Sequence, residues 1–114
     1  LFVTVRGEPN ADTSNPKLGM VMDFGDLKKI VKEEIVDQLD HAIMLNKSDL
    51  ENDEMLKHPM FSRHIIVDYQ PTCENLLVDF DKRIQNSLPE EIELFSLKLH
   101  ETATSFAEWY ATDN

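Results

Sequence analysis

The sequence predicts an α+β protein in which an antiparallel sheet is covered on one face by two long helices. Strand-like alternation of apolar and polar residues occurs near both ends of the chain, whereas apolar residues between them recur at helical spacing. The chain has 114 residues and 41% hydrophobic content, enough to build the core of one domain. We therefore expect residues 1–114 to form a single domain.

The charge of the chain limits which partners it can bind, and its cysteine content indicates the cellular compartment. The net charge of −11, from 22 acidic and 11 basic side chains, opposes binding to nucleic acid or to an anionic membrane surface. No apolar run is long enough to span a bilayer. The single cysteine, Cys73, excludes an intrachain disulfide framework and is typical of a reducing compartment. The sequence predicts a cytoplasmic protein without nucleic-acid or membrane partners.

The first elements are a strand, a loop and a long helix. Residues 1–8 alternate as a strand, and because the pattern starts at the first residue we expect earlier residues of the natural chain to be absent here. Turn-forming residues follow at 9–16, and residues 18–22 are predicted to be a short extended segment. Asp23 is a predicted N-cap, and six apolar residues then share one helical face. They are Phe24, Leu27, Ile30, Val31, Ile35 and Leu39.

The middle of the chain predicts one short helix, one extended run and a second long helix. Residues 48–51 have the form of a capping box, which predicts a short helix ending before Pro59. Residues 65–67 are a brief extended run. Thr72 then follows Pro71 as a predicted N-cap, and the stripe behind it continues to Leu88. The stripe consists of Cys73, Leu77, Phe80 and Ile84.

Two strands are predicted to end the chain. From Glu91 the apolar period changes to two, which places one row of side chains on a common face of a strand. That row is Phe95, Leu97, Leu99 and Glu101, and the opposite row is Ile92, Leu94, Ser96, Lys98 and His100. The last strand is predicted over residues 104–111.

Asp40 and His41 are the first candidate catalytic pair. A carboxylate beside an imidazole can fix its tautomer and stabilise its protonated form, which makes a general acid/base that works near neutral pH. In the alternative interpretation, Asp40 helps to end the preceding helix and His41 packs in the turn. The dipeptide leaves both interpretations open.

Three further residues have two interpretations each. Glu101 ends an apolar row, so a core-facing carboxylate there needs a partner with several donors, unless the strand end simply reaches solvent. Thr72 and Glu74 suit the first turn of a helix, and capping alone explains them. Cys73 lies on the apolar stripe, where a small buried hydrophobe is the commoner role.

Five short motifs follow one another in a distinctive order. They are Gly19-Met20-Val21-Met22-Asp23-Phe24, Leu27-Lys28, Leu39-Asp40-His41 with Leu45-Asn46, Pro71-Thr72-Cys73-Glu74-Asn75, and Leu99-His100-Glu101-Thr102. In order and spacing, the whole chain resembles the family of 6-pyruvoyl-tetrahydropterin synthase and 6-carboxy-tetrahydropterin synthase. The resemblance implies the tunnelling fold, in which the sheets of several copies form a β-barrel ring around a pore. It therefore implies a homo-oligomer, a trimer or a hexamer.

The resemblance also implies roles for the candidate residues. His41 would work with Asp40 in proton transfer on the side chain of a reduced pterin triphosphate. Glu101 would anchor the pterin and complete the catalytic set, and a carboxylate suits the parallel N–H donors of an aminopyrimidine edge. Thr72 and Glu74 would help to shape the pterin pocket.

The metal-binding part of the family pattern is missing. The family has a catalytic cysteine and three zinc-binding histidines, two of them in a His-Gly-His motif, ahead of the strand that begins here. Cys73 does not match that cysteine by position, and His58, His64 and His100 do not reproduce the ligand spacing. We assign no metal ligand to this chain, and we expect zinc, which would bind and acidify the substrate's hydroxyls, only in the full-length protein. Residues 1–114 would then lack the N-terminal strand and the metal-binding segment.

The expected function is that of a zinc-dependent lyase acting on 7,8-dihydroneopterin triphosphate. The product would be 6-carboxy-tetrahydropterin, on the pathway to queuosine, or 6-pyruvoyl-tetrahydropterin. The alternatives are a folate-pathway variant that forms 6-hydroxymethyl-dihydropterin and a non-catalytic pterin-binding ring protein. A chain of this charge would repel a triphosphate unless zinc, helix N-termini or a few basic groups focus positive potential locally.

Overall fold

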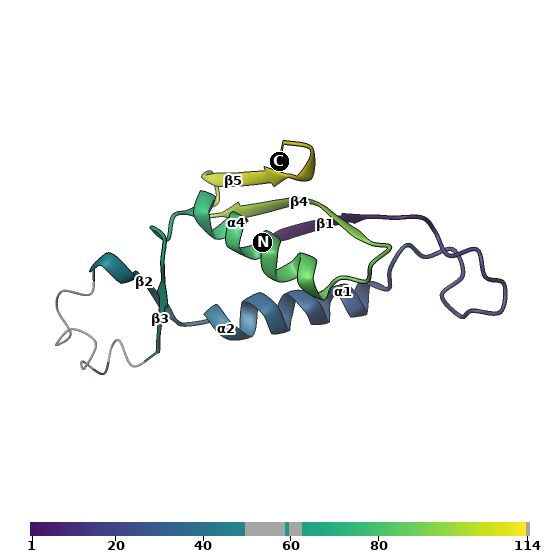
Figure 1. The fold of residues 1–114 in the computed structure, drawn as a ribbon, viewed down its shortest axis with the longest axis horizontal. Helices are drawn as coiled ribbons and strands as arrows, with labels where there is room; N and C mark the ends of the chain where they lie inside the picture. The colour runs from purple at the N-terminus through teal and green to yellow at the C-terminus, as the bar shows by residue number, and fades with distance from the viewer. Residues whose placement is uncertain (50–58, 60–62, 114) are drawn as a thin grey trace.

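The computed structural model of the protein describes residues 1–49, 59 and 63–113. Its regular elements form one antiparallel sheet, one helical layer and a small second sheet (Figure 1). The strands are β1 (Phe2–Arg6), β2 (Ile43–Asn46), β3 (His64–Val67), β4 (Glu93–His100) and β5 (Phe106–Tyr110). The helical segments are α1 (Phe24–Val31), a π-helical turn (Lys32–Val36), α2 (Asp37–Leu39) and α4 (Cys73–Ser87), with short 3₁₀ turns at Lys47–Asp49 and Ala111–Asp113.

The main sheet has the strand order β1-β4-β5, and both pairings are antiparallel. The segment from α1 to α2 forms one continuous helix that runs in the opposite direction to α4, and both helices lie on the same side of the sheet (Figure 1). The predicted α+β class, with an antiparallel sheet and two long helices, is therefore confirmed. In the described part of the chain, no helix is both long and apolar enough to cross a membrane.

The core lies between the helices and the sheet. Its buried members come from the π-helical turn, α4 and β4, and they are Ile35, Leu77, Phe80, Ile84, Leu94 and Leu97. Burial of each such side chain contributes about 1.5–3 kcal/mol. The apolar stripe predicted for the second long helix is thus confirmed at Leu77, Phe80 and Ile84, whereas Cys73 is only partly buried. Phe24, in contrast, was predicted to share the buried face of the first helix, but it is 78% exposed.

Both predicted N-caps are confirmed. The Asp23 side chain accepts a hydrogen bond from the backbone N–H of Gly25 at 2.7 Å, and the Thr72 hydroxyl accepts one from the backbone N–H of Asn75 at 3.2 Å. Each cap satisfies one of the donors that the first helical turn leaves without a partner. The starts of α1 and α4 are therefore determined locally.

A β-bulge changes the predicted faces of β4. Thr4 pairs with Ser96 while Val5 pairs with Leu94, so Phe95 is an extra residue between two ladder positions. Leu94 and Leu97 are consequently both buried in the core, although strict alternation placed them on opposite faces. The prediction that Phe95 shares a face with Leu97 is wrong.

Phe95 lies on the sheet face that points away from the helices. There the Arg6 guanidinium lies 5.4 Å from the centre of its ring, and the Tyr110 ring packs edge-on at 6.3 Å. Phe2 and Phe106, on the strands either side of β4, are more than half exposed. Within the described residues, this face therefore carries exposed aromatic side chains.

One other prediction is wrong, and a second lies mostly outside the described residues. Residues 18–22 form turns and bends rather than a strand. The backbone of Asn10 instead exchanges hydrogen bonds with Gly19 and Met20, each at 2.8 Å, which closes the loop. Of the short helix predicted after Ser48, only the 3₁₀ turn Lys47–Asp49 lies in the described residues, and the remainder lies outside them.

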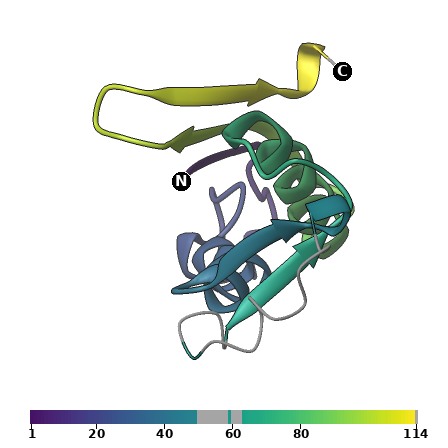
Figure 2. The ribbon, with the colours of Figure 1, turned by 90° about the vertical axis from the view of Figure 1, so that its left-hand side faces the viewer.

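The small second sheet was not predicted as a sheet. β2 and β3 pair in parallel from Ile43 with His64 to Asn46 with Val67. Only the extended run in β3 was predicted, and the strand that follows the Asp40–His41 turn was missed. Seen from the end of the molecule, these two strands lie apart from the β4–β5 hairpin, which projects beyond the helices (Figure 2).

Candidate functional site

The Asp40–His41 turn directly follows the long helix. The backbone N–H of Asp40 donates to the Val36 carbonyl at 2.9 Å, and that of Ala42 donates to the Leu39 carbonyl at 3.0 Å. His41 has φ +55°, in the left-handed region that residues other than glycine rarely adopt. Its side chain is 91% exposed, and its Nε2 lies 3.9 Å from Asp40 Oδ2. The alternative in which His41 packs in the turn is therefore wrong, and the turn presents an imidazole and a carboxylate to solvent.

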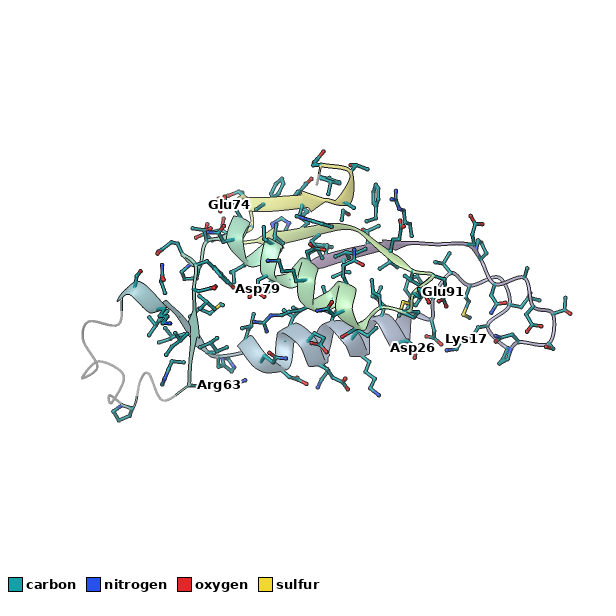
Figure 3. The ribbon with its side chains drawn as sticks, in the orientation of Figure 1. Lys17, Asp26, Arg63, Glu74, Asp79 and Glu91 are labelled. Atoms are coloured by element: carbon teal, nitrogen blue, oxygen red, sulfur yellow. The ribbon has the colours of Figure 1, made fainter. Side chains whose placement is uncertain are left out.

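Arg63 holds the chain on both sides of this turn. Its guanidinium donates to the Asp37 carbonyl at 2.5 Å, and its own carbonyl accepts from the Ile43 backbone N–H at 3.0 Å. One residue, placed just ahead of β3, thus fixes the last turn of the helix and the first residue of β2 (Figure 3). The sequence alone did not single out Arg63, because its partners are backbone carbonyl and N–H groups that every residue offers.

The start of α4 presents the second group of predicted residues. The Asn75 side chain donates to the Gln70 carbonyl at 3.0 Å, and the Thr72 backbone N–H donates to the same carbonyl at 2.8 Å. Asn46, at the end of β2, reaches the Gln70 side chain at 3.4 Å. These hydrogen bonds hold the loop before the helix in place. Glu74 lies in the first helical turn, and its side chain is exposed.

Glu101 follows the end of β4. It is the first residue of the turn between β4 and β5, where its backbone N–H donates to the Ser105 carbonyl at 2.9 Å. The side chain is exposed, so in this chain the strand end reaches solvent, as in the alternative interpretation. Its ligand role stays a prediction.

The Cys73 thiol lies in the first turn of α4, where its pKa is raised above the ordinary value. Burial raises the pKa of the Cys73 thiol, and the charges of Glu101 and then Glu74 raise that pKa further. Two carboxylates thus act on one thiol from different elements. The thiol is kept protonated by this environment, which is the opposite of what a nucleophilic cysteine needs.

The structure gathers the predicted residues into two groups. The charges of Glu101 and Glu74 both act on the Cys73 thiol, whereas Asp40 and His41 occupy a separate turn. Figure 1 shows the end of α2, the start of α4 and the β4–β5 turn at the same end of the helical layer. One group offers two exposed carboxylates, and the other offers an exposed imidazole beside a carboxylate.

The opposite end of the molecule contains a cavity of about 780 Å³. Its lining includes Lys17, Asp26 and Glu91, which Figure 3 shows far from Glu74. None of the predicted site residues lines it. The cavity is therefore separate from both groups of site residues.

The described residues do not provide a metal centre. In residues 1–49, 59 and 63–113, no three His, Cys, Asp or Glu side chains are grouped so that they could hold a metal ion. His64 and His100 belong to this part of the chain, whereas His58 lies outside it. The residues present do not fit a zinc ion, and no chemical step on this chain is assigned to one.

A partly buried polar network was missed by the sequence analysis. The Tyr69 hydroxyl donates to Asp79, and Asp79 accepts two hydrogen bonds from Arg83, at 2.8 and 3.2 Å. Burial by itself raises the pKa of the Asp79 carboxyl, but the hydrogen bonds from Arg83 and Tyr69 outweigh it and bring that pKa below its usual range. The spacing of Asp79 and Arg83 was a signal for an ion pair on one helix face, but nothing in the sequence indicated Tyr69.

We expect Asp79 to make the stability of the fold sensitive to acid. Because its pKa is lower in the folded than in the unfolded state, its contribution is complete above about pH 4 and is lost as the pH falls through the folded value. Asp79→Asn should lower the free energy of unfolding by about 1–2 kcal/mol at neutral pH. The difference from the parent should shrink below about pH 4.

Urea denaturation at a series of pH values measures this difference. Asp26→Asn is the matched control, because Asp26 forms an ion pair of the same 2.8 Å length with Lys17 but both side chains are about half exposed. Its effect should be smaller at every pH. A stability difference for Asp79→Asn that does not change with pH would contradict the prediction.

The described fold and the two groups of polar residues define an α+β protein with a candidate site for a small, donor-rich ligand. The family described as 6-pyruvoyl tetrahydropterin synthase matches residues 1–112. The chain belongs to this family, and the resemblance inferred from the motifs is confirmed.

Curated relatives agree with this assignment. The chain is 33% identical over 98 residues to a protein of Haemophilus influenzae named 6-carboxy-5,6,7,8-tetrahydropterin synthase, a match that covers 84% of this chain and 68% of that protein. A protein of Rickettsia conorii with the same name is 32% identical over 100 residues, which cover 86% of this chain and 72% of the relative. The 6-pyruvoyl tetrahydrobiopterin synthase of Pongo abelii is 36% identical over 102 residues, which cover 90% of this chain and 56% of the relative. All three relatives are named as synthases, so the expectation of an enzyme family is confirmed.

Proposed function

We propose that the protein is a tetrahydropterin synthase of the 6-carboxy type, a lyase that acts on 7,8-dihydroneopterin triphosphate. The observation that carries this proposal is the similarity to bacterial proteins named 6-carboxy-5,6,7,8-tetrahydropterin synthase over more than four fifths of the chain. A product of the 6-pyruvoyl type is the second candidate, because the Pongo abelii relative bears that name.

In this proposal the pterin binds where the β4–β5 turn approaches the start of α4. The Glu101 carboxylate accepts hydrogen bonds from the N–H groups of the pterin ring, and a charged acceptor strengthens such bonds. Thr72 and Glu74 shape the pocket from the helix start. Support comes from the position of the β4–β5 turn at the same end of the helical layer as the start of α4, and from the charges of Glu101 and Glu74, which both help to raise the pKa of the Cys73 thiol.

The Asp40–His41 turn supplies proton transfer to and from the substrate's side chain. Its exposed imidazole is free to meet a substrate, and the carboxylate 3.9 Å away stabilises the positive charge that the ring acquires. The unusual backbone of His41 is consistent with this role, because strained residues gather at functional sites.

We further propose that the full-length protein binds zinc through residues that precede residues 1–114, and that it has an additional N-terminal strand there. Metal analysis of the full-length protein tests this part. Zinc in the purified protein, and loss of turnover when a chelator removes it, are the expected results. A fully active protein without zinc would refute zinc dependence.

The assembly belongs to the proposal as well. In the described part of the sheet, β1 and β5 each pair on one side only, and such edges are usually paired or covered. Exposed Phe2 and Phe106 flank β4 on the outer face, where further chains would cover them. We propose a β-barrel ring of the tunnelling type, with sites completed where copies meet.

Light scattering of the full-length protein tests the ring. We expect the mass of three or six chains in neutral buffer, because burial of open edges and exposed aromatic side chains favours association. Lys98→Glu, on the outer face beside Glu108, is a suitable perturbation, since it removes a 3.8 Å ion pair and places like charges together. A monomeric parent protein at micromolar concentration would refute the ring.

Product analysis tests the reaction itself. The full-length protein is incubated with 7,8-dihydroneopterin triphosphate, and the products are separated by chromatography against standards of the three candidate pterins. The 6-carboxy product is expected. Another pterin product would change the assignment within the family, and pterin binding without turnover would favour the non-catalytic alternative.

A further inference from the structure

The Asp79–Arg83 pair is the least exposed ion pair in the described part of the chain. The two side chains are 18% and 24% exposed, whereas the partners of the other pairs are between 31% and 91% exposed. Asp79 also accepts a hydrogen bond from the Tyr69 hydroxyl. A guanidinium held by two hydrogen bonds to one carboxylate has a fixed orientation. The pair therefore points the remaining Arg83 donors in one direction.

Those donors reach the other long helix. Arg83 Nη1 donates to the Gln38 side chain at 2.8 Å and lies 3.5 Å from the Glu34 carbonyl. One turn further along α4, the Ser87 hydroxyl donates to the Glu34 carboxylate at 3.0 Å. Arg83 thus joins α4 to the segment that leads into the Asp40–His41 turn.

The acceptors lie in and just after the π-helical turn, Lys32–Val36. A π turn adds a residue to the helical cycle and leaves carbonyls free for other donors. The Glu33 and Glu34 carbonyls accept from side chains here, from Gln38 at 3.2 Å and from Arg83. Such turns are frequent at functional sites. The helix end is therefore shaped by a feature that Arg83 contacts directly.

The two ends of this network lie beside the two groups of site residues. Gln38 is two residues before Asp40, and Tyr69 is three residues before Thr72. Resting on the proposed function, we propose that Arg83 is a positioning residue that, held by Asp79 and Tyr69, orients the Asp40–His41 turn for proton transfer. It contacts no substrate, and its effect on the reaction passes through His41.

Arg83→Met tests this role in the full-length enzyme, because Met keeps the length of the side chain but removes every donor. We expect kcat to fall at least about tenfold, since small errors in the position of a catalytic group have effects of this size or larger. KM and the Kd for neopterin should stay within about twofold, because the pterin-binding group lies elsewhere. Lys17→Met is the matched control, since it breaks an ion pair of the same 2.8 Å length at the other end of the molecule and should leave kcat unchanged.

A double mutant separates positioning from general damage. If Arg83 acts through His41, Arg83→Met should not lower kcat further in an enzyme that already carries His41→Ala. The same fold-reduction in both backgrounds would overturn the inference. His41→Ala alone with full turnover would instead refute the proposed function, so the two failures are distinguishable.

Gln38→Met provides a second test of the same inference if the Arg83→Met variant does not fold. Gln38 is exposed, and this change leaves the Asp79–Arg83 pair intact while it removes the link to the helix end. We expect a reduction of about threefold or more in kcat, smaller than for Arg83→Met, and again only when His41 is present. An unchanged kcat in Gln38→Met would overturn the inference.

Discussion

His41→Ala should lower kcat by about 10²- to 10⁴-fold in the full-length enzyme, the range in which general acid/base groups contribute. The side chain is 91% exposed and makes no contribution to the core, so its loss should leave the fold intact. Rapid-mixing or steady-state kinetics with 7,8-dihydroneopterin triphosphate measure the effect. A variant with the parent's kcat would remove His41 from the catalytic machinery.

The backbone of His41 provides the matched control. At φ +55° an alanine is strained by about 1–2 kcal/mol relative to glycine, because only glycine lacks the Cβ that clashes there. His41→Gly should therefore be the more stable variant but should lose the same kcat as His41→Ala. If glycine restored turnover, the imidazole would matter for the shape of the turn and not for proton transfer.

Glu101→Gln should weaken pterin binding by about 1.5–3 kcal/mol, or about 10- to 150-fold, the scale of hydrogen bonds to charged groups. Gln keeps the shape of the side chain but loses its charge and turns one acceptor into a donor, which faces the donors of the pterin. Calorimetry with neopterin measures the two affinities.

Glu90→Gln is the control for this experiment. Glu90 is an exposed carboxylate beyond the far end of α4, so the same chemical change there should leave the affinity unaltered. Equal affinities for the parent and Glu101→Gln would remove Glu101 from the site. The pterin proposal would then depend on the similarity to named synthases alone.

Local chemistry made the helices predictable. Thr72 caps α4 with its own hydroxyl, and Leu77, Phe80 and Ile84 are buried as their spacing predicts. These features depend on residues only a few positions apart, so the sequence contains the information directly. The motif containing Asp40 was likewise placed correctly at the end of the first helix.

Features that depend on distant partners were not predictable in the same way. The parallel pairing of β2 with β3 joins two four-residue segments across a long stretch of chain. The bulge at Phe95 depends on the register with β1, and strict alternation cannot anticipate it. The hydrogen bond from Tyr69 to Asp79 depends on how α4 packs against the segment before it. The separation between the Glu101 group and the Asp40–His41 turn is likewise a property of the whole chain.

The bulge at Phe95 decides which face of the sheet each later residue of β4 occupies. Leu94 precedes the bulge on the helix side of the sheet, and one uninterrupted alternation from there would turn Glu101 to the opposite side. With Phe95 inserted, Leu97 and Leu99 return to the helix side, and the same alternation assigns position 101, just after the strand, to that side. Deletion of Phe95 would therefore remove the bulge and keep Leu94, Leu97, Leu99 and Glu101 on one face of a regular strand, whereas Phe95→Ala would keep the bulge and remove only an aromatic ring.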